Sequence, residues 1–263
     1  MLEAENLDVS IGKARIVRDA SFVAQAGEVT AIVGPNGSGK TTLLRAVSGD
    51  LSYTGTARIN GRDCRTLSSW KMAEMRAVLP QATTLAFPFT VREIVGLGLT
   101  SGRSGASGSA LVDLPRRALE RVDLDGFAGR FYQELSGGEQ QRVQLARVLC
   151  QVWEPVLEGQ PRWLFLDEPV SSLDIKHQLI VMEIAAEFAR RGGGVIAVLH
   201  DLNLAAMFAN RIIVMNRGRV DTSGSPREVL ADDLFSRVFD CQLKVNVQPS
   251  GELPFVLPQS ARL

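Results

Sequence analysis

The sequence predicts an α/β fold in which helices cover a parallel β-sheet, and two observations support this class. An apolar, β-branched run at residues 29–33 ends in a glycine-rich loop, and a helix is expected from Lys40 to about Gly49. Further along, short apolar strands alternate with helices. The strands are expected at 163–166, 195–199 and 211–215, and the helices near 175–191 and 202–209. Such alternation is typical of right-handed βαβ crossovers, which build a parallel sheet covered on both faces.

An antiparallel β layer is expected beside this sheet, built from the first 60 residues. The patterns at 2–9 and 16–24 predict strands, and a turn at 26–28 follows them. A further strand is expected at 54–59, because it runs into Asn60-Gly61, the strongest short turn signal in the chain. This layer would flank the parallel core.

The middle of the chain, from about residue 86 to residue 159, predicts helices and loops. A small, polar, glycine-rich stretch at 101–110 indicates a surface loop. Helices are expected near 115–122 and 137–152. Because this segment interrupts the α/β core in sequence, we expect it to protrude as a helical lobe.

One domain is therefore expected over residues 1–263. Its α/β core with the β layer comes from 1–85 and 160–240, and its helical lobe from 86–159. The remaining tail, 241–263, is expected to form a small hairpin from strands at 243–247 and 253–257.

The composition is that of an ordinary globular protein. The chain has 263 residues, with 29 basic and 29 acidic side chains, so no long-range attraction for polyanions is expected, and no nucleic-acid partner. The first residues lack the features of a signal peptide, and no apolar run approaches the roughly 18 residues that span a bilayer. The three scattered cysteines predict reduced thiols. These features favour a soluble, cytoplasmic protein.

The glycine-rich loop at 34–42, GPNGSGKTT, predicts a phosphate-binding site. Its glycines allow backbone N–H groups to point inward at phosphate oxygens, and the following helix adds its positive end. Lys40 is expected to reach the terminal phosphates and Thr41 to offer a hydroxyl to Mg²⁺. The expected nucleotide contacts are Gly34, Pro35, Asn36, Gly37, Ser38, Gly39, Lys40, Thr41 and Thr42. The alternative is a plain glycine turn beside a lysine, which the preceding strand and following helix disfavour.

A pair of carboxylates follows the apolar run at 164–166, where the ligands of α/β sheets bind. Asp167 is suited to hold Mg²⁺, and Glu168 to orient or deprotonate an attacking water. A solvated acid pair is the alternative, although Pro169 and the apolar residues before the pair disfavour it. The sequence thus predicts a P-loop NTPase (RecA-like) core, with the β layer and the inserted α-helical lobe added to it.

With LSGGEQQR at 135–142, these motifs resemble the ATP-binding-cassette (ABC) ATPases over nearly the whole chain. The resemblance implies an ATPase that uses ATP and Mg²⁺ and works as a head-to-tail homodimer. In that family the LSGGQ signature binds the γ-phosphate of ATP held by the partner subunit. Here the matching residues are Ser136, Gly137, Gly138 and Glu139, whose exposed backbone donors at a helix start suit an anion.

Three more positions match the family's motifs. Gln81 matches the glutamine that contacts Mg²⁺ and senses the transport partner, and Asp174 matches the loop that crosses the dimer interface. His200 matches the switch histidine at the γ-phosphate, so its implied role is catalytic, with Glu168 and Lys40. One feature departs from the family: no aromatic residue near the amino terminus is available to stack on adenine, which leaves Arg15 or an aliphatic side chain.

The stretch at 80–99 resembles importer subunits that serve iron chelates, haem and cobalamin, and its apolar residues suit a permease helix or the core of the lobe. The long, proline-bounded stretch at 151–161 resembles the ATPase subunits of haem importers. This implies a peripheral protein on the cytoplasmic face of the inner membrane. Its partners would be two copies of a transmembrane permease and, indirectly, a periplasmic or surface substrate-binding protein.

Three alternatives stay open. The first keeps the ATPase role and changes the cargo to ferric siderophore or cobalamin. The second is a soluble ABC ATPase that acts on nucleic acid or the ribosome, although the paired cassettes or basic extensions usual in that class are missing. The third is a nucleotide-binding regulator without turnover, which Glu168 and His200 disfavour.

Overall fold

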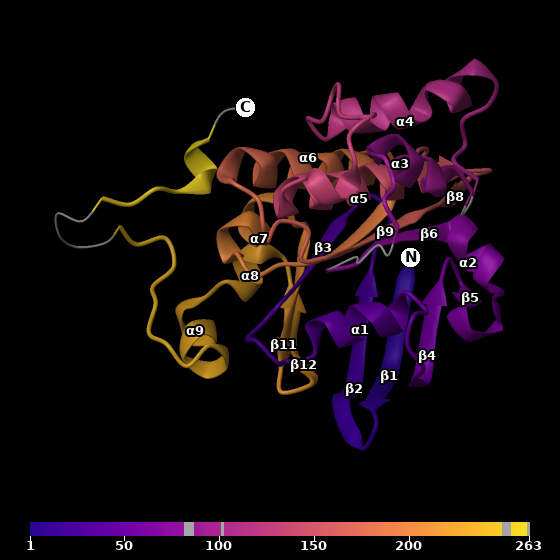
Figure 1. The fold of residues 1–263 in the computed structure, drawn as a ribbon. Coiled ribbons are helices and arrows are strands. Elements are labelled where there is room, and N and C mark those ends of the chain that lie inside the picture. Colours follow the sequence, from indigo (N-terminus) through magenta and orange to yellow (C-terminus); the bar gives the residue numbers. More distant parts are fainter. Residues whose placement is uncertain (82–86, 101–102, 249–253, 262–263) are drawn as a thin grey trace.

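The computed structural model describes residues 1–81, 87–100, 103–248 and 254–261, and Figure 1 shows sheets and helices in layers. Within this part of the chain, the largest sheet has six strands. In spatial order they are β12 (Arg219–Gly224), β11 (Arg211–Asn216), β3 (Val29–Val33), β10 (Gly194–Val198), β9 (Trp163–Asp167) and β6 (Arg76–Leu79). All neighbours are parallel except β12, which pairs antiparallel with β11. The predicted parallel sheet is confirmed.

The centre of this sheet is fully buried, as its sequence predicts. Every residue of β3, β9 and β10 is buried, which explains why these strands are continuous apolar runs. The register places Val198 opposite both Asp167 and Ile32, and Leu79 opposite Leu166. The carboxyl ends of β3, β6, β9 and β10 therefore meet at one edge of the sheet.

The predicted antiparallel layer is also present. It is a four-stranded sheet with the order β2 (Ala14–Ala24), β1 (Leu2–Ile11), β4 (Thr54–Ile59) and β5 (Arg62–Asp63). Asn60 and Gly61 both have positive φ, 52° and 75°, in the turn that leads from β4 to β5. Helix α1 (Lys40–Val47) buries Leu43 and Leu44 in the core that this layer shares with Trp163 and Phe165 of the large sheet.

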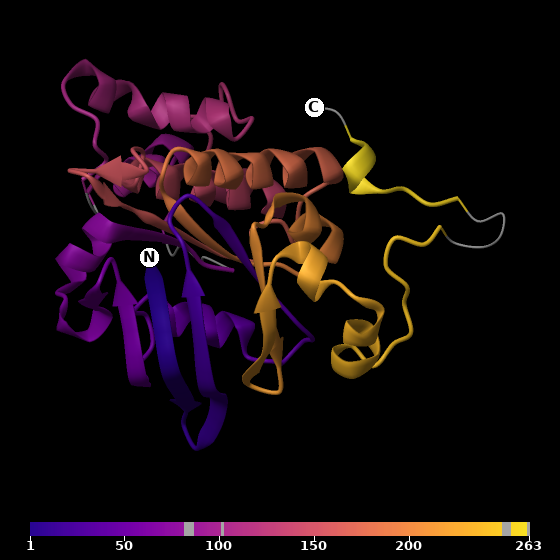
Figure 2. The same cartoon turned by 180° about the vertical axis from the view of Figure 1, so that it is seen from behind.

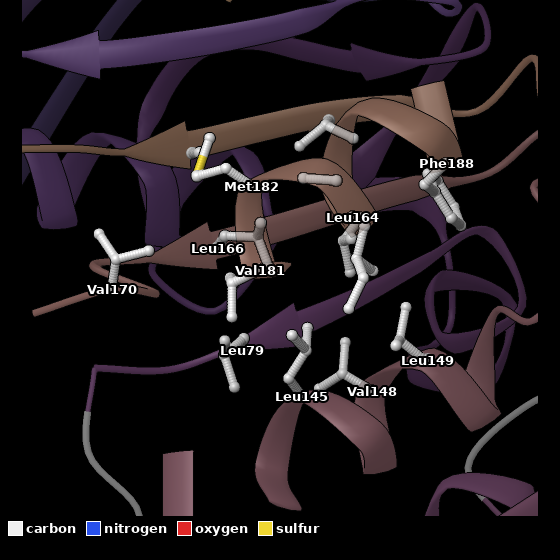
Figure 3. Close-up of a cluster of buried hydrophobic side chains, with 14 of the residues drawn as sticks. Leu79, Leu145, Val148, Leu149, Leu164, Leu166, Val170, Val181, Met182 and Phe188 are labelled. Carbon is white, nitrogen blue, oxygen red and sulfur yellow. The ribbon is translucent and has the colours of Figure 1, made fainter. Parts of the chain in front are cut away.

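The opposite face of the large sheet is covered by α5 (Gly137–Gln151) and α6 (Ile175–Arg190), seen from both sides in Figures 1 and 2. Figure 3 shows their buried side chains against those of the strands. The labelled members of this cluster are Leu79, Leu145, Val148, Leu149, Leu164, Leu166, Val170, Val181, Met182 and Phe188.

Helices also dominate the segment between β6 and β9. Besides α5 they are α3 (Val91–Thr100) and α4 (Ser109–Arg121). Helix α3 approaches α5 so closely that a Cβ on Gly98 would lie 2.1 Å from the carbonyl oxygen of Arg147. Helix α4 begins six residues earlier than predicted, because Pro115 lies inside the helix and not at its start. Part of the predicted 101–110 loop, residues 101–102, lies outside the described residues.

The long, proline-bounded stretch at 151–161 holds a short hairpin. Strand β7 (Val156–Leu157) pairs with β8 (Gln160–Pro161) across Glu158 and Gly159, both of positive φ. The side chain of Arg162, 1% exposed, fastens this stretch to the loop before α4. It donates to carbonyl oxygens of Arg103, Ser104, Gln151 and Glu154.

The remaining elements of the described residues are short. They are α2 (Ser69–Met75), α7 (Leu202–Phe208), α8 (Pro226–Val229), α9 (Asp232–Val238) and the 3₁₀ turns at Cys64–Thr66, Tyr132–Glu134 and Pro258–Ser260. No helix in the described part of the chain is long and apolar enough to cross a membrane.

The predicted C-terminal hairpin is wrong for the residues that the structure describes. Residues 243–248 and 254–257 form no strand, and 249–253 lie outside the described residues. The physical reason is that the apolar side chains of the two expected strands have no sheet to pack against. Leu243, Val247 and Val256 are 55%, 58% and 81% exposed. Figure 2 shows residues 243–248 and 254–257 as irregular chain outside the layered body of the molecule.

Candidate active site

A cavity of about 490 Å³ lies over α4 and α6, and a larger one of about 810 Å³ lies where the parallel strands end. The larger cavity gathers half of the residues that the motifs single out. Its lining comprises Ile16, Asn36, Gly37, Gly39, Lys40, Thr41, Thr42, Gln81, Glu168 and His200. We take it as the candidate site, because the glycine-rich loop meets Gln81, Glu168 and His200 there.

The loop between β3 and α1 has the backbone that its glycines predict. Gly34, Gly37 and Gly39 have φ of 145°, 75° and 98°, a region that other residues rarely adopt. At Gly34 space is also limiting, because a Cβ would lie 2.1 Å from the carbonyl oxygen of Met215. The loop is thus a cradle whose curvature leads directly into the positive end of α1.

The Lys40 side chain is bent back over this loop. Its Nζ donates to the carbonyl oxygens of Gly34 and Pro35, each at 3.0 Å, and the residue is 5% exposed. Burial lowers the pKa of Lys40, and the nearby Glu168 and Asp167 carboxylates oppose that shift. A buried ammonium beside a glycine-rich loop that opens a helix is suited to bind an anion.

Thr41 and Asp167 form the pair expected to hold Mg²⁺. The Thr41 hydroxyl donates to Oδ1 of Asp167 at 2.8 Å, and Asp167 is 3% exposed. Burial raises the pKa of Asp167, against the effect of the Thr41 hydrogen bond. Burial makes the negative charge of this carboxylate costly, and a bound cation would offset that cost. The carboxylate and the neighbouring hydroxyl both offer oxygen atoms, the ligands that a hard divalent cation prefers.

Glu168 lies at the centre of the site and is held from two sides. Nε2 of Gln81 donates to its Oε2 at 2.9 Å, and Nε2 of His200 lies 2.7 Å from its Oε1. These partners follow β6 and β10, the two neighbours of β9, so the sheet itself brings the three side chains together. Glu168 also has φ of 52°, an uncommon conformation for a residue other than glycine, and such strain clusters at functional sites.

The signature residues form a separate site at the start of α5 and do not line this cavity. Ser136 is the N-cap, and with Glu139 it forms a capping box. The Glu139 carboxylate accepts from both the backbone N–H and the hydroxyl of Ser136, at 2.7 Å each, which lowers the pKa of Glu139. The Glu139 carboxylate therefore lies against the first turn of α5, the helix to which it belongs.

The signature helix is nevertheless tied to the cavity. Nε2 of Gln141 donates to the carbonyl oxygen of Glu168 at 2.9 Å. Gly138 lies so close to the loop before α6 that a Cβ would come within 3.0 Å of the Ser172 carbonyl oxygen. Asp174 ends that loop and caps α6 by accepting from the backbone N–H of His177.

The structure favours an aliphatic surface at the position where an aromatic residue was missing. Ile16 lines the cavity beside Gly37 and Gly39, while Arg15 donates from Nε to Asp8 at 2.7 Å and does not line it. No role for Ile16 or Gln141 was predicted from the sequence. Gln141 lies within the signature motif and Ile16 in a strand, and neither pattern distinguishes a site residue from ordinary packing.

Comparisons with known proteins agree with this geometry. The ABC transporter family matches residues 17–171. The chain is 66% identical over 261 residues to the hemin import ATP-binding protein HmuV of Mesorhizobium japonicum, covering 99% of both chains. It is 62% identical to the protein of the same name from Chelativorans sp. strain BNC1, again over 99% of both.

Solved structures show the same fold. The dimeric structure of MJ0796, a bacterial ABC transporter cassette, has a TM-score of 0.74 at 26% identity, over 86% of this chain and 99% of that one. The ATP-binding subunit of an ABC transporter has a TM-score of 0.77 at 23% identity, over 91% and 96%. The predicted α/β fold with a P-loop NTPase core is thereby confirmed.

Proposed function

Because this chain belongs to the ABC transporter family, we propose that it is the ATP-hydrolysing subunit of an importer for haem. The observation that carries the ATPase assignment is the convergence of Lys40, Thr41, Glu168 and His200 on one cavity. The observation that carries the cargo is the identity of 66% to a hemin import ATP-binding protein over nearly the whole chain.

In the proposed reaction the loop at 34–42 binds the phosphates of ATP. Lys40 leaves its two carbonyl partners for the terminal phosphates, and Asn36, Ser38 and Thr42 complete the cradle. Thr41, Asp167 and Gln81 would hold Mg²⁺, which when bound supplies charge neutralisation on the phosphates. Glu168 orients the attacking water and accepts its proton, and His200 fixes the Glu168 carboxylate and faces the γ-phosphate.

The proposed active unit is a homodimer, because the signature residues lie outside the cavity of their own subunit. Ser136, Gly137 and Gly138 would cap the ATP held by the partner subunit, and Asp174 would line the contact between the two. This arrangement makes hydrolysis depend on closure of the dimer. We propose the whole chain as one such domain, with residues 86–159 as the lobe that carries the signature.

The proposed partners are two copies of a transmembrane permease, and the chain would sit at the cytoplasmic face of the membrane. Phe87 is 69% exposed. An exposed aromatic side chain of this kind suits contact with a permease helix. The apolar stretch proposed at 80–99 lies partly outside the described residues, at 82–86. A substrate-binding protein would act only through the permease.

Ferric siderophore or cobalamin import is the second candidate, with the same ATPase role. A role on nucleic acid or the ribosome is disfavoured by the balance of 29 basic and 29 acidic side chains. The deciding experiment is ATP hydrolysis by this chain with its permease in vesicles, with a haem-loaded, a siderophore-loaded or a cobalamin-loaded binding protein. Haem alone is expected to raise turnover and to accumulate. Stimulation only by another cargo would overturn the haem assignment, and binding to RNA or DNA would overturn the transport role.

A further inference from the structure

A histidine outside the cavity bridges two aspartates that are far apart in the sequence. His177, in the first turn of α6, places Nδ1 2.7 Å from Oδ1 of Asp174 and Nε2 3.3 Å from Oδ2 of Asp123. Asp123 follows α4 and has φ of 57°. Nζ of Lys176 lies 2.6 Å from the same oxygen of Asp123. The imidazole therefore joins the loop after α4 to the loop before α6.

The Asp123 end of this bridge is fixed to the signature helix. Arg142 of α5 is 7% exposed, and its Nη1 donates to the carbonyl oxygens of Val122 and Asp123, at 2.8 Å and 2.7 Å. Helix α5 begins just after the N-cap Ser136. Contacts thus run without interruption from the signature helix through Asp123 and His177 to Asp174.

Both aspartates of this bridge are stabilised in their charged form. The Lys176 hydrogen bond, assisted by His177, lowers the pKa of Asp123, and the backbone N–H of His177 lowers that of Asp174. An ionised carboxylate only accepts hydrogen bonds, so each of them depends on the donors that surround it.

We infer that His177 is a positioning residue that links the signature helix to Asp174. The inference rests on the proposed function, in which Ser136 and Asp174 meet the partner subunit. The Asp174 side chain is 66% exposed, so packing does not fix it, and the His177 contacts determine where its carboxylate points. Movement of the signature helix on dimer closure would reach Asp174 through this bridge.

Steady-state ATP hydrolysis by the full chain tests this coupling. His177→Ala is expected to lower kcat about fivefold, the effect of one ordinary hydrogen bond, and to leave KM for ATP within about twofold. Asp123→Asn should lower kcat as well, and the double variant should be no slower than His177→Ala, because both act through one path. Lys176→Ala is the matched control. It removes an exposed ion pair on Asp123 but keeps the ring, so turnover should change little.

Two results would overturn the inference: unchanged kcat in His177→Ala, or multiplied losses in the double variant. Thermal unfolding of each variant separates coupling from misfolding. If the parent chain shows no ATPase activity at all, the proposed function fails instead.

Discussion

The Gln81 amide donates to Oε2 of Glu168 at 2.9 Å, while Nε2 of His200 lies 2.7 Å from Oε1. Among the residues that the structure describes, each oxygen of the proposed base thus has one partner, and each partner follows a different strand. A carboxylate oxygen accepts more than one hydrogen bond, so a water can join without displacing either partner. The sheet therefore fixes the direction of the base.

Glu168→Gln keeps the size of the side chain and removes its ability to accept a proton. We expect turnover to fall by at least about 100-fold, the usual contribution of a general base. ATP binding should persist, and ATP should hold the variant as a dimer in size-exclusion chromatography. Unchanged turnover would contradict the role of Glu168 as the base.

Asp167→Asn should stabilise the protein at neutral pH in the absence of MgATP. Burial raises the folded pKa of Asp167, so the wild type loses stability as pH rises through that pKa. An amide carries no charge and still accepts the Thr41 hydrogen bond. The gain, measured by urea unfolding, should disappear below the ordinary aspartate pKa of about 3.9.

The opposite sign is expected with MgATP, because ligand binding stabilises only a protein that binds it. Asp167→Asn should then be less stable than the wild type. If the variant gained equally from MgATP, Asp167 would not be a metal ligand.

Glu139→Gln should strengthen the ATP-dependent dimer. The amide keeps the capping position over Ser136 and removes a negative charge from the place where the partner's γ-phosphate is proposed to bind. We expect the apparent dimer dissociation constant, measured with the Glu168→Gln background and ATP, to fall about threefold. An unchanged or higher dissociation constant would contradict the proposed position of Glu139 beside the phosphate. Glu134→Gln, just before the signature, is the matched charge control.

Two neighbouring glycines provide a test of packing at the signature. A Cβ on Gly137 meets nothing within 4 Å, whereas on Gly138 it lies 3.0 Å from the Ser172 carbonyl oxygen. Gly137→Ala should stabilise the helix start by roughly 0.5 kcal/mol in denaturant unfolding, and Gly138→Ala should be less stable than it by about 1 kcal/mol. Equal stabilities of the two variants would show that the loop before α6 moves aside to accommodate the added methyl group without measurable cost.

The sequence predicted the parts of the fold that are fixed by local pattern. Strands β3 and β4 begin and end where expected, because a fully buried run and an Asn-Gly turn leave little choice. The glycine-rich loop and the carboxylate pair were predicted from short motifs, because phosphate and metal binding require these residue types at fixed spacing. Their meeting at one edge follows from the parallel order of the strands.

The features that the sequence did not predict depend on contacts between distant segments. The hairpin expected in the tail has the right alternation at 243–247, but alternation alone does not provide a neighbouring sheet. The hydrogen bond between Gln141 and Glu168, and the bridge at His177, each join an ordinary helix residue to a loop. Only the packing of α5 and α6 on the sheet brings these side chains together.

The shared site is tested most directly by mixing a Lys40→Ala subunit with a Ser136→Ala subunit. Each variant alone has no intact site, whereas a mixed dimer has one site built from the intact loop of one subunit and the intact signature of the other. Random pairing should restore about a quarter of the wild-type ATPase rate, from one intact site in half of the dimers. A mixture as inactive as its components would contradict the account.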